Sequence, residues 1–498
     1  MSRQCEPERS SLNWRDEAGV TLDWWVEHWL AGLLLLVYTG LLLHHANLGR
    51  RRAKGVAGYY VGGRNAGGFV IGVSFFATYA STNSYIGNAG KGYDYGLPWL
   101  AYAGVMVFFT WLAWAAVAPK VRRFAAHWDA LTLPDLLHAR FAPQTPTLRL
   151  VSALVVVASS LLYLMAIFKG AGALFQHFLQ IPYTAAIGVT LVIVMLYTSV
   201  GGFVSVVRTD VAQGLLMVAG SALMFYFVTS AAGGVSVLPE LRERPDTAIL
   251  FEFGGAVPLV VLMGIALSGS LKLLVDPRQV ARFYALRDEK ALKVGMWVSV
   301  AGIALVQFSL YPIGMYAHFL VEGVTDTDNI VPLLINDRSV FPLAVSDFLI
   351  IAILAAAMSS MDSVLLVAAS VLYNDIIKTI KPSKRPLAWT RMGIIGFAAV
   401  SAALALDPPA GIIELTIFSG SLYAVCFFPA IVFGLHWRRG SARAALGAMA
   451  TGVPVLLAWL ASGLSAHLHE VFPALATSCA TYVLLARTSR QAADPVRA

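Results

Sequence analysis

The sequence predicts an all-α integral membrane protein with about thirteen transmembrane helices. Apolar residues make up 58% of the 498 residues and charged residues only 13%, and the mean hydropathy is +0.70. The apolar residues gather in runs close to the about 20 residues that a helix needs to cross a bilayer. Backbone groups inside lipid must be satisfied within the segment, and a helix achieves this.

The chain divides into thirteen such runs. An odd number of spans places the two termini on opposite sides of the membrane. The spans are expected near 27–46, 68–88, 98–118, 149–176, 182–199, 203–229, 255–273, 294–319, 346–370, 391–406, 412–435, 444–463 and 471–486.

The distribution of basic residues predicts the orientation. The loop at 47–66 and every second connection after it carry 26 Lys and Arg residues, against 7 on the opposite side. Cytoplasmic loops are enriched in Lys and Arg, so we expect the tail 1–26 outside the cell and the tail 487–498 in the cytoplasm. The net charge of +8 is then an orientation signal. We expect a multi-pass protein of the cell (inner) membrane, in contact with lipids and without a nucleic-acid partner.

Other functional classes find little support. Cys5, Cys426 and Cys479 are too few and too scattered for a disulfide framework or a metal cluster. Residues 1–26 contain acids and tryptophans and do not resemble a cleavable signal peptide. We found no phosphate-binding glycine motif, nucleophile elbow or zinc signature. The histidines His44, His45, His467 and His469 are expected to be solvated or interfacial.

Two predicted spans contain polar and glycine-rich interruptions. Span 68–88 holds the polar run Ala77–Ser84, and span 255–273 holds Gly264 and Ser268-Gly269-Ser270. Paired interrupted helices in corresponding positions of two halves indicate the central site of a transporter. Close packing of helices against small residues is the alternative explanation.

The stretch 348–372 is apolar but carries a polar face in its middle. Ala356, Ser359, Ser360 and Ser363 fall within one arc of a helix, with Asp362 at its edge. Hydroxyl residues also join membrane helices to one another. An ionised carboxylate at membrane depth, however, requires a partner or a water-filled cavity. With Asp362 among them, these residues favour a cation site.

Further charged residues lie at or near predicted spans. Asp210 is expected to face inward, although a helix-end position at the interface is the alternative. Lys169 could pair with an acid or a solute carboxylate, or lie at a helix interface. The basic segment 276–293 is predicted to lie against headgroups, and the acidic loop 322–337 to cap the site from outside.

Taken together, five motifs resemble those of the sodium/solute symporter family. The resemblance runs from about residue 30 to 485, in order. The motifs are Tyr60-Val61-Gly62-Gly63-Arg64, the segment Ala77–Ser84, Leu131-Thr132-Leu133-Pro134-Asp135, the series Tyr197-Thr198, Gly201-Gly202, Thr209-Asp210 and Gln213, and Ser359-Ser360-Met361-Asp362-Ser363.

This resemblance implies a LeuT-like core of five-plus-five inverted repeats. The repeats would cover 67–230 and 250–436, with an extra helix at 27–46 and two C-terminal helices within 440–486. It also implies a bound sodium ion and a monomeric transport unit. The implied sodium ligands are the carbonyls of Ala77, Ala80 and Ala356 and the hydroxyls of Ser359 and Ser360. A second cation site or path would involve Asp210, Asp362 and Ser363.

The resemblance also limits the solute. Tyr79 stands where proline carriers have an acid, and the run through Tyr85-Ile86-Gly87 is more similar to pantothenate and small-carboxylate carriers. Candidate solute-binding residues are Tyr79, Ser81 and Asn83. We therefore expect sodium-coupled symport of a small carboxylate-bearing solute, such as pantothenate, a monocarboxylate or an amino acid, by alternating access. Proton-coupled symport and a transporter-like solute sensor are the alternatives, and an enzyme is not expected.

Overall fold

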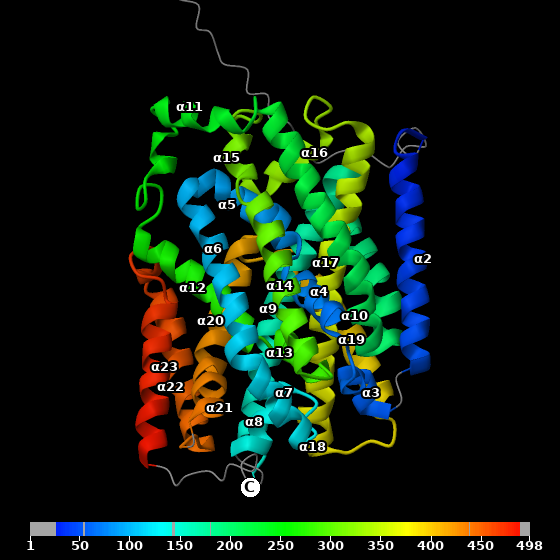
Figure 1. Cartoon of the computed structure of the whole chain (residues 1–498), viewed down its shortest axis with the longest axis vertical. Coiled ribbons are helices and arrows are strands. Elements are labelled where there is room, and N and C mark those ends of the chain that lie inside the picture. The colour runs from blue at the N-terminus through cyan, green and yellow to red at the C-terminus, as the bar shows by residue number, and fades with distance from the viewer. Residues whose placement is uncertain (1–25, 53–54, 142–144, 180, 438, 489–498) are drawn as a thin grey trace, which may run out of the picture.

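The computed structural model describes residues 26–52, 55–141, 145–179, 181–437 and 439–488. In these ranges the regular structure is helical apart from one isolated bridge between Ala66 and Leu286. Eleven helices of the described chain are long and apolar enough to cross a membrane. They run side by side along the longest axis (Figure 1). The predicted class, an all-α integral membrane protein, is confirmed, while the number thirteen stays a prediction.

The helices used below have the following bounds: α2 Trp29–Arg52, α3 Gly55–Val61, α4 Gly68–Tyr79, η2 Asn83–Gly87, α5 Asn88–Tyr95, α6 Leu97–Leu112, α8 Leu133–Phe141, α9 Thr147–Leu179, α10 Tyr183–Ala231, α11 Leu238–Glu243, α12 Leu259–Val275, α13 Pro277–Ala285, α14 Glu289–Leu310, η6 Thr327–Asn329, α16 Ile330–Asn336, α17 Leu343–Val371, η7 Leu372–Ile377, α18 Lys378–Ile380, α19 Pro386–Leu404, α20 Ile412–Phe428, α22 Ala442–Ala461 and α23 Val471–Thr488.

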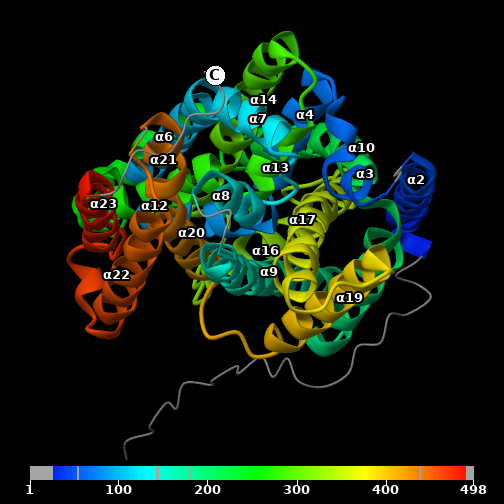
Figure 2. The same cartoon turned by 90° about the horizontal axis from the view of Figure 1, so that it is seen from below.

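Helix α17 lies at the centre of the bundle. In the most apolar window of the span Leu343–Ile380, 94% of the residues are buried, against 22% for α2. Figure 2 shows α2 and α23 at opposite edges of the molecule, with α17 between them. A helix enclosed by protein has no lipid face to keep apolar, which permits the polar residues at its middle.

Helix α10 is a single 49-residue element that covers the predicted spans 182–199 and 203–229. It turns back at Gly202, whose φ of 63° is readily adopted by glycine but not by L side chains. The backbone oxygen of Tyr59 would lie 2.9 Å from a Cβ at this position, so no larger residue fits. The Tyr59 hydroxyl donates to the Ser199 carbonyl and fixes α3 against the turn.

The predicted interruption in the second span is present. Helix α4 ends at Tyr79, and Ala80 is extended, with φ −67° and ψ 124°. The chain then continues through the π-helical turn η2 into α5. The helical ladder stops where Ala80 N–H donates to Phe76 O, which leaves the carbonyls of the last turn of α4 available to other partners.

The second interruption lies elsewhere than predicted. Helix α12 continues regularly through Ser268-Gly269-Ser270 and breaks at Asp276, which is extended before Pro277. The residue before a proline is disfavoured in the α region, so the Asp276-Pro277 pair ends the helix. Gly264 and Gly269 instead permit close packing, because a Cβ there would lie 2.1 Å from His469 and 1.6 Å from the Tyr102 hydroxyl.

The prediction that 276–293 lies against headgroups is wrong for its first half. Every residue of α13 is buried, including Arg278 and Arg282. The two guanidinium groups find acidic partners inside the protein, which accounts for their burial. His469 is likewise buried and therefore not solvated.

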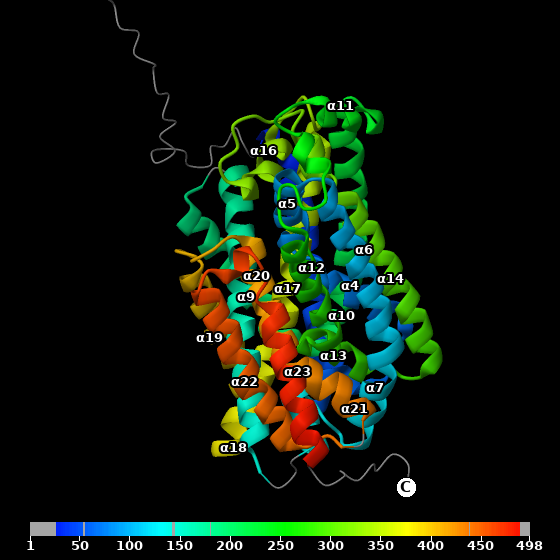
Figure 3. The same cartoon turned by 90° about the vertical axis from the view of Figure 1, so that its left-hand side faces the viewer.

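The two ends of the bundle differ. Helices α11 and α16 lie at one end, and α8 and α18 at the other (Figures 1 and 3). We refer to these as the α16 end and the α8 end. Helix α16 packs against α5, α9 and η2, so the loop 322–337 covers the α4 break from the α16 end. The predicted tails 1–26 and 487–498 fall almost entirely outside the described residues.

Candidate cation and solute site

The broken end of α4 meets the polar face of α17. Ser360 Oγ donates toward the carbonyls of Thr78 and Ala80, at 3.0 and 3.2 Å. Ala356 lies one helical turn before Ser360, and Ser359 lies one residue before it. All three residues are fully buried. The predicted sodium ligands Ala77, Ala80, Ala356, Ser359 and Ser360 therefore belong to the two contacting elements.

The hydroxyl of Ser359 is oriented by a carboxylate. Ser359 Oγ donates to Asp210 Oδ1 at 2.5 Å. A serine hydroxyl has one hydrogen and two lone pairs, so a hydroxyl that donates to Asp210 keeps its lone pairs for a cation. Asp210 therefore orients the hydroxyl of Ser359, one of the predicted sodium ligands.

Arg282 fills the space beside Asp210. Its Nη2 lies 3.0 Å from Asp210 Oδ2 and 2.6 Å from Ser363 Oγ, and it also donates to Thr78 Oγ1. Ser74 Oγ donates to the same Asp210 oxygen at 2.5 Å. Two of the three residues predicted for a second cation site, Asp210 and Ser363, are thus close together, and a guanidinium lies between them.

The third of these residues, Asp362, faces a different neighbour. Its Oδ1 accepts a hydrogen bond from Thr198 Oγ1 of α10 at 2.5 Å. Its Oδ2 is buried and makes no hydrogen bond within the described part of the chain. Asp362 is buried next to the turn at Gly202, apart from the Arg282 guanidinium.

The predicted solute residues follow the α4 break in order. The Tyr79 hydroxyl donates to the Gly269 carbonyl of α12 at 2.9 Å. Ser81 is fully buried and accepts from the Asn83 backbone N–H. Asn83 opens the η2 turn on the side toward α16, and its Oδ1 is buried without a hydrogen bond among the described residues.

The sequence did not reveal the charged residues that lie nearest to this region. Lys272 of α12 places its ammonium 5.0 Å from the Tyr79 ring and 5.2 Å from the Tyr163 ring. Arg278 lies 4.0 Å from the Tyr163 ring and pairs with Asp276. The signal was present in Asp276-Pro277 at the end of an apolar run, because a proline there marks a helix break.

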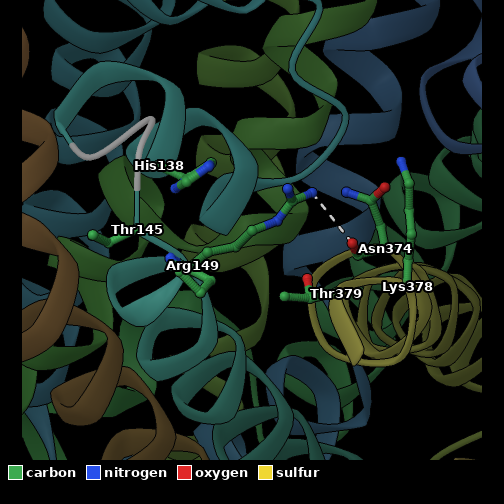
Figure 4. Close-up of a pocket in the computed structure, with 7 residues that line it drawn as sticks. His138, Thr145, Arg149, Asn374, Lys378 and Thr379 are labelled. Carbon is green, nitrogen blue, oxygen red and sulfur yellow. Dashed lines mark hydrogen bonds between the residues drawn. The ribbon is translucent and has the colours of Figure 1, made fainter. Parts of the chain in front are cut away.

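A network of ion pairs closes the α8 end. Arg149 of α9 reaches η7, where its Nε lies 2.7 Å from Asp375 and its Nη2 donates to the Asn374 carbonyl. Arg149 also contacts Asp135, and Thr132 donates to Asp375. Figure 4 shows Arg149 at the wall of a cavity of about 280 Å³ that is also lined by His138, Thr145, Pro146, Asn374, Lys378 and Thr379. The Leu131–Asp135 motif therefore contributes to closing this end.

The α16 end has its own closing contact. Lys169 Nζ lies 3.0 Å from Asp328 Oδ2, which also accepts from the backbone N–H of Ile412 at the start of α20. Burial raises the pKa of Asp328 above its ordinary value, although Lys169 opposes the shift. Of the alternatives predicted for Lys169, the structure shows an ion pair with an acid, Asp328.

Comparison with known proteins identifies the family. The model of the sodium:solute symporter family matches residues 59–452. The chain belongs to this family. It is 28% identical over 436 residues to the sodium/pantothenate symporter of Haemophilus influenzae, covering 85% of this chain and 89% of that protein. It is 29% identical over 455 residues to the osmoregulated proline transporter OpuE of Bacillus subtilis, covering 89% and 92%.

Solved structures agree with this assignment at the level of the fold. A Na⁺-coupled sialic acid symporter, solved in a substrate-bound outward-open state, has a TM-score of 0.80 at 20% identity and covers 93% of this chain and 98% of its own. MhsT in complex with L-phenylalanine has a TM-score of 0.53 at 15% identity, with coverages of 84% and 97%. These structures confirm the LeuT-like fold. The family assignment confirms sodium as the coupling ion.

Proposed function

We propose that this symporter holds one sodium ion between the α4 break and α17. The ligands are the carbonyls of Ala77, Ala80 and Ala356 and the hydroxyls of Ser359 and Ser360. The observation that carries the proposal is that Ser360 Oγ meets two carbonyls at the end of a broken helix. Unwound carbonyls of half-helices coordinate Na⁺ in transporters of this architecture.

Asp210 serves as a positioning residue for this site. It accepts the hydrogen of Ser359, and Arg282 neutralises its charge. The site then contributes only neutral oxygen ligands to the ion. Because Arg282 already satisfies Asp210 and Ser363, the second cation site expected from the sequence receives no support from this arrangement.

The solute is a small organic molecule with a carboxylate, taken up by alternating access. Pantothenate and proline, named for the related proteins, both carry that group. The ion pairs at the α8 and α16 ends supply contacts that would break in turn as each side opens. Formation and loss of such contacts is how two arrangements of one fold exchange.

Orientation follows from the basic residues. Lys272, Arg278 and Arg282 are buried and no longer count as loop charges, yet the remaining Lys and Arg still gather at the α8 end. The α8 end and the C-terminus are therefore cytoplasmic, and the α16 end faces outward. The protein works as a monomer in the inner membrane, because the proposed site lies wholly within one chain.

The decisive experiment measures sodium-dependent uptake into proteoliposomes with Ser360→Ala. Loss of one oxygen ligand should raise the sodium concentration for half-maximal uptake by about 5- to 150-fold, the range of typical coupling energies. Apparent solute affinity should fall at low sodium and recover at saturating sodium. Ser401→Ala is the matched control, because it removes a buried hydroxyl in α19 that makes no hydrogen bond among the described residues.

Three results would contradict the proposal. Unchanged sodium dependence in well-expressed Ser359→Ala and Ser360→Ala proteins would remove the site from the mechanism. Uptake that follows a pH gradient and ignores sodium would replace sodium coupling with proton coupling. No uptake of any carboxylate or amino acid in the presence of a sodium gradient would favour a solute sensor.

A further inference from the structure

The α12–α13 break holds one positive charge more than the acids beside it can pair among the described residues. Lys272 and Arg278 lie close to Tyr163, within 5.2 and 4.0 Å of its ring centroid, and both side chains are almost fully buried. Asp276 is the acid of the α12–α13 break, and Arg278 engages both of its oxygens. One acid therefore faces two cations.

Neither cation is saturated by the protein. Among the described residues, the Lys272 ammonium makes no hydrogen bond or ion pair and lies over the Tyr79 and Tyr163 rings. Arg278 directs Nε and Nη2 to Asp276, while its Nη1 is buried without a hydrogen-bond acceptor in the described part of the chain. Contact with an aromatic face stabilises a cation less than burial of an unpaired charge costs, so the rings offset only part of that cost.

We infer that Lys272 and Nη1 of Arg278 bind the carboxylate of the transported solute. This inference rests on the proposed sodium-coupled symport and assigns the residues that recognise the solute. A carboxylate presents two oxygens with about four acceptor positions, which suits an ammonium and a guanidinium N–H. A cationic solute would be repelled, and a neutral one would leave the lysine charge uncompensated.

The position of the lysine also accounts for coupling to sodium. Tyr79, whose ring contacts the Lys272 ammonium, precedes Ala80, whose carbonyl lies at the proposed sodium site. A sodium ion bound there adds a second uncompensated positive charge near Lys272. An anionic solute beside Lys272 is attracted by both positive charges, so each ligand increases the affinity for the other, as linkage requires.

The test compares Lys272→Met with Lys272→Arg in purified protein. Thermal unfolding is followed with sodium and two pairs of probes, each a carboxylate and its neutral partner: pantothenate and panthenol, and propionate and propionamide. We expect carboxylates, and not their neutral partners, to stabilise the wild type in sodium. Lys272→Met should lose this shift while keeping the shift caused by sodium alone, and Lys272→Arg should keep part of it. Lys293→Met, an exposed lysine of α14, is the control for charge.

A second measurement does not depend on the choice of solute. If only a bound ligand neutralises the lysine charge, Lys272→Met should unfold at the same temperature as the ligand-free wild type or at a higher one. A clear drop in the unfolding temperature of Lys272→Met would show instead that the lysine is structural, and would overturn the inference.

The remaining outcomes are equally decisive. Stabilisation by a neutral probe equal to that by its carboxylate partner overturns the inference, as does a wild type that responds to sodium but to no carboxylate. A shift seen with sodium chloride and absent with sodium methanesulfonate would identify chloride as the occupant. A wild type that does not respond to sodium contradicts the proposed function itself, which separates the two failures.

Discussion

The buried pair of Asp210 and Arg282 makes a quantitative prediction about stability and sodium binding. We consider Asp210→Asn, Arg282→Gln and the double variant. In the wild type the two side chains are 3.0 Å apart, and their exposed fractions are 0% and 1%. Water cannot compensate either group when its partner is removed.

The expected magnitudes follow from this burial. Each single substitution leaves an uncompensated buried charge, which costs about 3–5 kcal/mol of unfolding free energy. The double variant removes both charges and should cost less than the sum of the two by about 3 kcal/mol, the upper end for residues in contact. Sodium affinity, in contrast, should remain lowered in the double variant. A neutral amide is a weaker acceptor than a carboxylate, so the Ser359 hydroxyl stays less well oriented there.

The assay is unfolding by SDS titration in mixed micelles, combined with sodium titration of uptake in proteoliposomes. The exposed pair Arg123 and Glu289, also 3.0 Å apart, is the matched control and should show a coupling below about 1 kcal/mol. Additive costs for Asp210 and Arg282 would refute the account of their charges. Recovery of both stability and sodium affinity in the double variant would show that Asp210 has only a structural role.

Two further predictions concern the ends of the bundle. In a variant without native cysteines, Thr325→Cys should react with an impermeant thiol reagent from outside intact cells, and Lys384→Cys should not. The reverse pattern would show that the orientation is opposite to the proposed one. Because the pKa of Asp328 is raised by burial in the closed arrangement, protonation favours closure, and this stabilisation is lost as the pH rises through that raised pKa. The labelling rate of Asn83→Cys relative to that of Thr325→Cys should therefore fall as the pH is lowered toward 3.8, the ordinary pKa of an aspartate. Asp328→Asn should abolish this pH dependence. A pH dependence that survives in Asp328→Asn would exclude Asp328 as its origin.

The sequence was sufficient for features that depend on local composition. The α4 break follows from a run of hydroxyl and small residues inside an apolar stretch, and Ser359 and Ser360 follow from helical periodicity. The family motifs added the fold. In each case the residues that carry the information are neighbours along the chain.

Features that depend on distant partners were not predictable in this way. Arg282 was expected at the membrane surface because its segment is basic and amphipathic. Its acidic partner, Asp210, is 72 residues away along the chain. The break in α12 was misplaced for a related reason. Gly264 and Gly269 resemble helix interruptions in the sequence, but their small size is required by His469 and Tyr102, which approach from other helices.

The turn at Gly202 has a consequence for biogenesis. A straight helix of 49 residues would be about 74 Å long at 1.5 Å per residue, far more than the about 30 Å of a hydrocarbon core. The two arms of α10 are joined at one residue with no polar loop between them, so neither arm has a separate signal to fix its direction. The two arms of α10 therefore enter the bilayer together as a hairpin, and the orientation of one dictates that of the other.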